Sequence, residues 1–203
     1  MPNYLNRNAV FFLAASIAAI LPLATLFTPM DAAPNVVFNV TTTADANDGA
    51  CTGSLCTLSD AVIAANGAPG ATINVPAGTY SLTLGALTVS SSMTISGAGA
   101  ISTTVDAGCN SQVFNITAGT VTISSMTIRR GFTGGVGGGV STAGNLTLDS
   151  VILRDNHASN AGGGVVAWTV SGMTGTLTLI NSTVISNLAS GAFGKSFNIV
   201  SAN

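Results

Sequence analysis

The sequence predicts an all-β fold: a right-handed parallel β-helix, a solenoid of roughly 25-residue coils, preceded by a short N-terminal capping helix. One observation is a thirteen-residue phrase that occurs three times, beginning at Gly119, Gly144 and Gly175. The copies start 25 and 31 residues apart (144 − 119 and 175 − 144), and a repeat of this length is typical of solenoids. Aliphatic residues also occupy the same columns in every copy, which favours stacked strands over a disordered glycine-rich tract.

Composition supports the same fold class. Charged residues make up 6% of the chain, against roughly 25% in ordinary soluble domains. The hydrophobic residues, 47% of the chain, are scattered in short alternating runs, as stacked strands require. The formal net charge of −2 excludes a basic face for nucleic acid, so we expect no nucleic-acid partner.

Each phrase predicts two short strands joined by a bend. Neighbouring residues of a strand point to opposite faces, so the phrase begins with two inner aliphatic columns separated by an outer threonine column. After a corner the alternation resumes one step out of phase, with Met126 over Val151 over Ser182. The three columns before the corner are Val121, Leu146 and Leu177; Ile123, Leu148 and Leu179; and, facing outward, Thr122, Thr147 and Thr178.

Further repeats suggest a third strand in each coil. Gly137-Gly-Gly-Val140 recurs as Gly162-Gly-Gly-Val165, again 25 residues on (162 − 137). A fainter copy of the phrase spans 85–97, where one extra serine brings 92–95 into line with 125–128. We therefore expect three strand-like faces with glycine-rich corners, wound with the right hand that parallel crossovers prefer.

The first thirty-three residues have the character of an export segment. Arg7 is the only charge before an uncharged run over 10–27, and Ala32 and Ala33 offer a cleavage point. The segment 1–33 is therefore interpreted as a signal peptide or an uncleaved N-terminal anchor. Either way we expect the rest of the chain to be secreted or displayed on the cell surface.

Export makes the three cysteines informative, because disulfides persist outside the cytoplasm. Cys51 and Cys56 flank four residues and are predicted to form a structural disulfide, which leaves Cys109 over in a later turn, free or able to exchange partners. Three cysteines and a distant His157 make no metal-ligand cluster, so we expect neither a metal nor a cofactor.

Directly after this loop, Thr57–Asn66 is predicted to be a helix. Thr57 or Ser59 provides an N-cap, and Asn66-Gly67 is a stop signal. Such a helix would cover the first coil, whose apolar core and strand edge would otherwise be exposed. Its apolar side is formed by Leu58, Ala61, Val62 and Ala65.

These N-terminal residues resemble the CSLREA domain, which opens many exported bacterial β-helix proteins. Its naming motif is matched at Cys56, Leu58 and Ala61, whereas Thr57, Ser59 and Asp60 replace Ser, Arg and Glu. The repeats are also similar to those of polymorphic outer-membrane proteins. The resemblance to the CSLREA domain rests on 38–45, 48–51, 56–66, 73–80 and 81–83. The similarity to the outer-membrane proteins rests on the repeat elements 137–140, 162–165, 153–156 and 184–187.

The resemblance implies an exported or cell-surface, structural or adhesin-like protein without catalytic activity, in the bacterial outer membrane or outside the cell. Expected partners are cell-surface glycans or proteins, with membrane contact only through 1–33 or a missing C-terminal anchor. The chain then divides into 1–33, a CSLREA-like cap and first coil over 34–84, and β-helix coils over 85–203. We expect these coils to be truncated at the C-terminus.

The alternative is a polysaccharide-active enzyme, a pectate-lyase-like lyase or a glycoside hydrolase, on the same solenoid. A hydrolase needs two carboxylates across one bond, and a lyase gathers several around Ca²⁺. The columns place Asp149 between Ser124 and Ile180, and Asp155 between Arg130 and Ser186. No carboxylate cluster is predicted, and no catalytic residue is assigned.

Candidate ligand-binding residues are Arg129, Arg154 and Trp168. Arg129 is predicted above Arg154, where the two cations repel one another unless an anion or a sugar acid bridges them. Arg130 is predicted above Asp155, close enough to pair with it. The single tryptophan, Trp168, is expected to pack on the coil surface or, if exposed, to stack on a sugar ring, while His157 alone is typical of a solvated turn residue.

Two further columns have structural or binding interpretations. Asn156 and Asn187 end equivalent phrases and are predicted to point inward as a structural amide ladder. The outward threonine columns also suggest ice binding, but three members make a short and irregular array.

Overall fold

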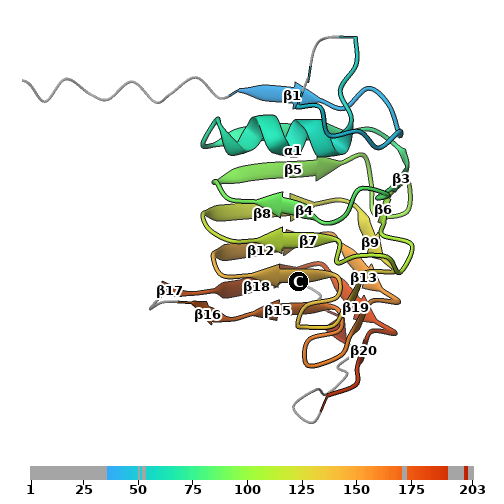
Figure 1. Cartoon of the computed structure of the whole chain (residues 1–203), viewed down its shortest axis with the longest axis vertical. Coiled ribbons are helices and arrows are strands. Elements are labelled where there is room, and N and C mark those ends of the chain that lie inside the picture. Colours follow the sequence, from blue (N-terminus) through green and yellow to red (C-terminus); the bar gives the residue numbers. More distant parts are fainter. Residues whose placement is uncertain (1–35, 50, 52–53, 171–172, 192–198, 201–203) are drawn as a thin grey trace, which may run out of the picture. The chain divides into compact units, whose positions relative to one another are not determined.

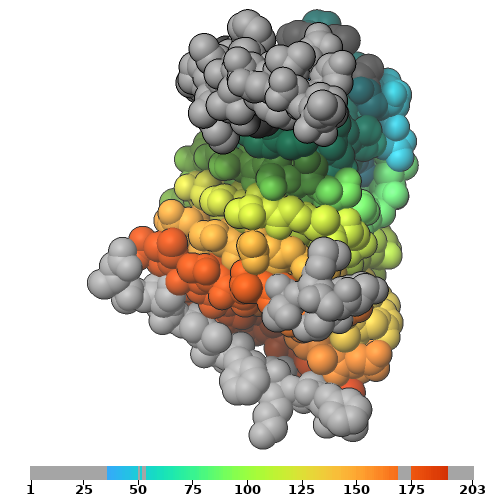
Figure 2. All heavy atoms as spheres, turned by 90° about the vertical axis from the view of Figure 1, so that its left-hand side faces the viewer, coloured from blue at the N-terminus to red at the C-terminus, as the bar shows by residue number. Residues whose placement is uncertain are grey.

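The computed structural model describes residues 36–49, 51, 54–170, 173–191 and 199–200. The expected signal peptide or anchor, 1–33, lies outside these residues. These described residues form a parallel β-solenoid of about four turns, and one short helix lies among them. The predicted all-β solenoid fold is therefore confirmed, and its coils follow one another in sequence order (Figures 1 and 2).

Three long sheets run along the stack, with a shorter sheet and a hairpin beside them. The first sheet contains β1 (Val37–Asn39), β2 (Ala71–Val75), β5 (Met93–Gly97), β8 (Thr120–Ser124), β12 (Asn145–Asp149) and β18 (Thr176–Ile180). The second contains β3 (Gly78–Ser81), β6 (Thr103–Asp106), β9 (Thr127–Arg129), β13 (Ile152–Arg154), β19 (Thr183–Ile185) and the antiparallel β21 (Ile199–Val200). The third contains β4 (Leu87–Val89), β7 (Phe114–Ile116), β11 (Val140–Thr142) and β15 (Val165–Ala167). The short sheet is β10 (Phe132–Thr133), β14 (His157–Ala158) and β20 (Leu188–Ala189), and the hairpin is β16 (Thr169–Val170) with β17 (Met173–Thr174).

The predicted columns are the columns of the solenoid. Leu146 lies between Val121 and Leu177 in the first sheet, and Thr147 faces outward beside it. Beyond the bend, Met126, Val151 and Ser182 are all buried. Bends with left-handed backbone separate the strands, at Ser125, Ser150 and Asn181 and again at Arg130, Asp155 and Ser186. Repeating the same turn in each coil keeps the strands in register.

The alignment expected for the upstream copy is wrong by one strand. Met93 pairs with Ala71 on one side and Val121 on the other, so 93–95 belongs to the first sheet and not to the second. The preceding Leu87–Val89 joins the third sheet. Met-Thr-Ile has the same inward-outward-inward alternation in either sheet, so the local pattern could not distinguish the two registers.

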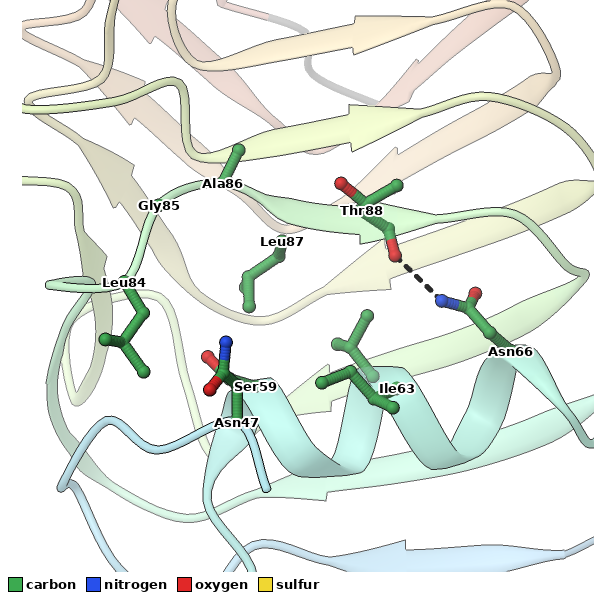
Figure 3. Close-up of a pocket in the computed structure, with 10 residues that line it drawn as sticks. Asn47, Ser59, Ile63, Asn66, Leu84, Gly85, Ala86, Leu87 and Thr88 are labelled. Carbon is green, nitrogen blue, oxygen red and sulfur yellow. Dashed lines mark hydrogen bonds between the residues drawn. The ribbon is translucent and has the colours of Figure 1, made fainter. Parts of the chain in front are cut away.

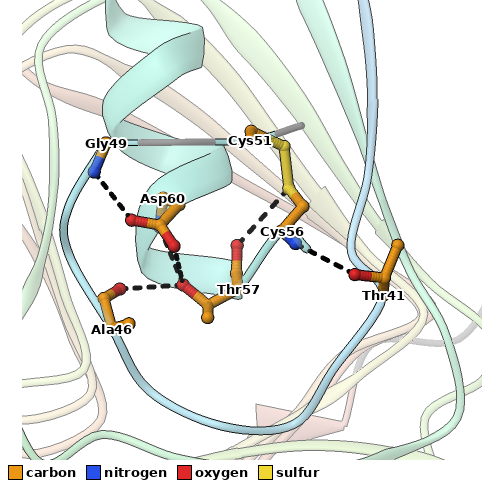
Figure 4. The surroundings of a disulfide bond; sticks show 7 residues. All are labelled: Thr41, Ala46, Gly49, Cys51, Cys56, Thr57 and Asp60. Atoms are coloured by element: carbon orange, nitrogen blue, oxygen red, sulfur yellow. Dashed lines mark hydrogen bonds between the residues drawn. A yellow bond between two sulfur atoms is a disulfide. The ribbon is translucent and has the colours of Figure 1, made fainter. Parts of the chain in front are cut away.

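The cap is built as predicted around α1 (Leu58–Asn66). Thr57 is the N-cap, and its hydroxyl accepts a hydrogen bond from the backbone N of Asp60. Cys51 and Cys56 form the predicted disulfide just before the helix (Figure 4). Asp60 Oδ1 accepts from the backbone N of Gly49 at 2.9 Å, so this buried carboxylate fastens the preceding loop to the first helical turn.

The β16–β17 hairpin accounts for the longer sequence separation between the strands β12 and β18. Val121 to Leu146 is 25 residues, whereas Leu146 to Leu177 is 31, yet both pairs are in register. The six extra residues (31 − 25) match the length of 169–174. Trp168 and Gly175 close the base of the insertion through a backbone hydrogen bond of 3.0 Å.

Candidate functional site

Four of the charged residues considered in the sequence, Arg129, Arg130, Arg154 and Asp155, lie on or just beyond the strands of the second sheet, where Asp106 joins them. The strands β6, β9 and β13 lie side by side (Figure 1), and their register places Asp106 beside Arg129 and Arg129 beside Arg154. Arg130 and Asp155 follow β9 and β13 at the bends. We call these five residues the charged cluster; its formal charge is +1, from three arginines and two aspartates.

Asp106 is the centre of the charged cluster. Its side chain is 1% exposed and accepts from Arg129 Nε at 2.7 Å, from Arg130 Nε at 2.7 Å and Nη2 at 2.6 Å, and from the Gly108 backbone N at 2.9 Å. Burial raises the pKa of Asp106, but the hydrogen bonds from Arg130, Gly108 and Arg129 together outweigh it and lower the pKa below its ordinary value. The carboxyl is therefore ionised at neutral pH.

The predicted pair of Arg130 with Asp155 is wrong. Arg130 binds Asp106, and Asp155 instead accepts from Arg154 Nη1 of its own coil at 2.6 Å. The hydrogen bond to Asp106 also raises the pKa of Arg130. A buried carboxylate that accepts two bonds from one guanidinium is a stronger partner than the 43% exposed Asp155. Repulsion between Arg129 and Arg154 is thus offset by carboxylates within the protein.

The other residues considered in the sequence are not members of the charged cluster. Trp168 follows β15 of the third sheet and is exposed. Cys109 is free and exposed, and its backbone N donates to the Arg130 carbonyl at 2.7 Å. His157 begins β14 and is half-buried: its ring centroid lies 5.3 Å from that of Phe132, and Nε2 lies 2.6 Å from Ser190 Oγ. His157 is therefore a packed strand residue, not the solvated turn residue expected.

The amide ladder lies inside the solenoid. Asn156 and Asn187 are both buried, and Asn156 Nδ2 donates to Asn187 Oδ1 at 2.9 Å. Asn156 also accepts from the Gly131 backbone N and donates to the Ile128 carbonyl, while Asn187 donates to the Leu153 carbonyl. This ladder satisfies backbone groups at the bends and leaves no group for a ligand.

A cleft of about 240 Å³ lies between α1 and β4 (Figure 3). Ile63 and Leu84 contribute exposed apolar side chains to it. Asn66 spans its far end, where Nδ2 donates to the Thr88 carbonyl and Oδ1 accepts from the Ser90 backbone N. The described residues that line it include no ionisable side chain, so they offer no acid or base. They are Asn47, Ser59, Val62, Ile63, Asn66, Leu84, Gly85, Ala86, Leu87 and Thr88.

Carboxylates are dispersed over the described coils. Asp149 lies between Ser124 and Ile180 in the first sheet, as the columns predict, and Asp155 lies beyond β13 in the second. Among the described residues, no three His, Cys, Asp or Glu side chains gather where they could hold a metal ion.

Sequence reasoning missed the extent of the threonine column on the first sheet. Thr72 and Thr94 extend the predicted outer column, because β2, β5 and β8 are in register. The signal that could have revealed them is the pair of motifs Ala71-Thr-Ile and Met93-Thr-Ile. Both match Val121-Thr-Ile once 93–95 is assigned to the first sheet. We call the outward side of β2, β5, β8, β12 and β18 the hydroxyl face. Its central column is Thr72, Thr94, Thr122, Thr147 and Thr178.

Comparisons with protein-family models, with curated proteins and with solved structures each find no match to this chain. Within the described part of the chain, no helix is long and apolar enough to cross a membrane.

Proposed function

We propose that this chain is an exported or cell-surface β-solenoid protein of the adhesin kind, without catalytic activity, whose first coil is closed by a CSLREA-type cap. The disulfide between Cys51 and Cys56 supports export, because such bonds persist outside reducing compartments. The uncharged run over 10–27 supports it independently as an export signal.

The state of Asp106 is the observation that carries the non-catalytic assignment. Arg129 and Arg130 keep this carboxyl ionised, so it is no general acid, and at 1% exposure it is too buried to meet a substrate as a base or a nucleophile. The same contacts hold both guanidinium groups in place. The charged cluster is thereby suited to present fixed positive charge, not to transfer protons.

The ligand class that fits this cluster is an acidic glycan, and Arg154 is its main contact. The Arg154 side chain is 40% exposed, and its partner Asp155 is equally open to solvent. Such surface pairs contribute only about 0–1 kcal/mol, so a ligand carboxylate can replace Asp155 at little cost. Arg129 lies beside Arg154 in the register, and Trp168 would contact sugar separately, from the third sheet.

The test uses the full chain, produced with residues 1–33 in a bacterium. Fractionation should place the protein outside the cytoplasm, and mass spectrometry should find Cys51 linked to Cys56. Polygalacturonate should bind it more tightly than neutral dextran, and Arg154→Ala should weaken that binding by about tenfold, the loss of roughly 1.4 kcal/mol. Asp155→Asn is the matched control and should bind at least as well as wild type. Unchanged binding in Arg154→Ala would overturn the glycan site.

The enzymatic alternative is tested on the same protein. With or without Ca²⁺, we expect neither reducing ends nor unsaturated products from pectin and related glycans. Turnover that disappears in Arg154→Ala or Asp155→Ala would overturn the non-catalytic assignment.

A further inference from the structure

We propose that the hydroxyl face binds ice. This inference goes beyond the proposed function and does not depend on it, because the face lies on the first sheet and the charged cluster on the second. The five threonines of the central column stand directly opposite one another on five successive parallel strands. The repeated phrases alone indicate three of them, which is too short an array, and the register of the first sheet adds Thr72 and Thr94.

The array repeats in two directions. Neighbouring strands are about 4.8 Å apart, and outward residues along one strand are about 6.6 Å apart, twice the rise of roughly 3.3 Å per residue. On one side of the threonines, Thr120, Asn145 and Thr176 form a second outward column. On the other side are Asn74, Ser96, Ser124, Asp149 and Ile180, with Asn39 of β1 beyond Asn74. A ligand that matches both repeats must itself be a lattice, whereas a single glycan chain matches one direction only.

The flanking columns are held in place by hydrogen bonds between coils. Asn74 Nδ2 donates to Asn39 Oδ1 at 2.8 Å, and Ser124 Oγ donates to Ser96 Oγ at 3.3 Å. On the opposite side, Thr176 Oγ1 donates to Asn145 Oδ1 at 2.8 Å. These bonds fix the borders of the face, so little side-chain freedom remains to be lost when a rigid surface docks.

The central hydroxyls are available to water. In the described part of the chain, the hydroxyls of Thr94, Thr122, Thr147 and Thr178 make no hydrogen bond to protein, although each lies on a rigid strand. Each of these threonines is half-buried or exposed on the outward side of its strand. Methyl groups limit how nearby waters orient, and the free hydroxyls anchor those waters at a fixed spacing.

The hydroxyl face is also almost uncharged. Asp149 is the only charged residue on its described strands, and it lies at the border column. Charged groups would organise water around themselves and attract counterions, which an ice lattice excludes. A neutral, regular array of hydroxyls with a strand spacing close to the a-axis repeat of hexagonal ice therefore favours ordered water over an acidic or protein ligand.

The experiment measures thermal hysteresis and the inhibition of ice recrystallisation by the full chain. We expect both activities in wild type and their loss in Thr122→Tyr and Thr147→Tyr, whose rings would stand above the plane of the face. Thr104→Tyr is the matched control, because Thr104 is a half-buried outward threonine of the second sheet, and it should keep wild-type activity. Circular dichroism must show that all three variants fold.

Three outcomes would overturn the proposal. The first is folded wild-type protein that leaves ice crystals unshaped at concentrations where it stays monomeric. The second is an equal loss of activity in the two face variants and the control. The third is a dimer, found by sedimentation, that Thr122→Tyr dissociates, which would assign the face to a second copy. Loss of glycan binding in Arg154→Ala would leave the ice result unchanged, so the two proposals fail separately.

Discussion

Two polar columns of this solenoid are built from the same principle and differ in which way they face. Asn156 and Asn187 stack inside it, where water is absent and every amide group must find a protein partner. Thr122 and Thr147 stack outside, where water takes that role. The comparison indicates that stacking like residues contributes stability when the column is buried and produces a surface with a fixed spacing when it is exposed.

The largest expected effect is on the inner column. Asn156→Leu should lower the free energy of unfolding by about 3 kcal/mol, because the Gly131 N–H, the Ile128 carbonyl and the Asn187 amide lose a buried partner. Urea unfolding measures this loss. A change below about 0.5 kcal/mol would show that the ladder is not the stabilising column.

The next effect tests the glycine that makes room for the ladder. A Cβ at Gly139 would lie 2.4 Å from the Gly164 carbonyl oxygen and 3.0 Å from Asn156 Nδ2. Gly139→Ala should therefore destabilise the protein by about 2 kcal/mol, as overpacking does. Gly134→Ala is the control, because nothing lies within 4 Å of its added Cβ. Equal losses in the two variants would place the close approach elsewhere.

A smaller loss of stability is expected when Asp106 of the charged cluster is replaced, and this loss should depend on pH. Folding lowers the pKa of Asp106, so its stabilisation is complete above the unfolded value of about 3.9 and is lost as the pH falls through the lower folded pKa. Asp106→Asn should thus lose stability at pH 7 and show a shallower acid decline than wild type.

Wild type must be compared with Asp106→Asn because folding lowers the pKa of a second acid, Asp45, as well. Burial raises the pKa of Asp45, yet hydrogen bonds from Ser59, Thr83 and Leu84 lower it overall. The difference between wild type and Asp106→Asn removes this shared contribution. Parallel acid profiles would contradict the role given to Asp106.

The smallest effect belongs to the outer column. Thr147→Ser keeps the hydroxyl and removes only a surface methyl group, so the free energy of unfolding should change by less than about 0.5 kcal/mol. The same urea titration provides the measurement. A loss as large as that of Asn156→Leu would mean that the outer column also supports the fold.

Alternation along the chain was sufficient to predict the inner and outer columns, the ladder of Asn156 and Asn187, and the apolar side of α1. It could not decide the register of 93–95, because a three-residue alternation fits two sheets equally well. The same alternation did not reveal Asp106 as the salt-bridge partner of Arg130. Asp106 lies on β6, outside the repeated phrases, so only the stacking of coils brings it beside β9.

The β16–β17 hairpin shows how such a chain can change length. Six residues are added between Ala167 and Thr176, yet Leu146 and Leu177 remain opposite one another. Lengthening a surface loop costs little closure entropy, so the strands on either side keep their pairing. The junction after Trp168 is thus a natural position for grafting a foreign peptide, and gene variants of different length can arise there without repacking the interior.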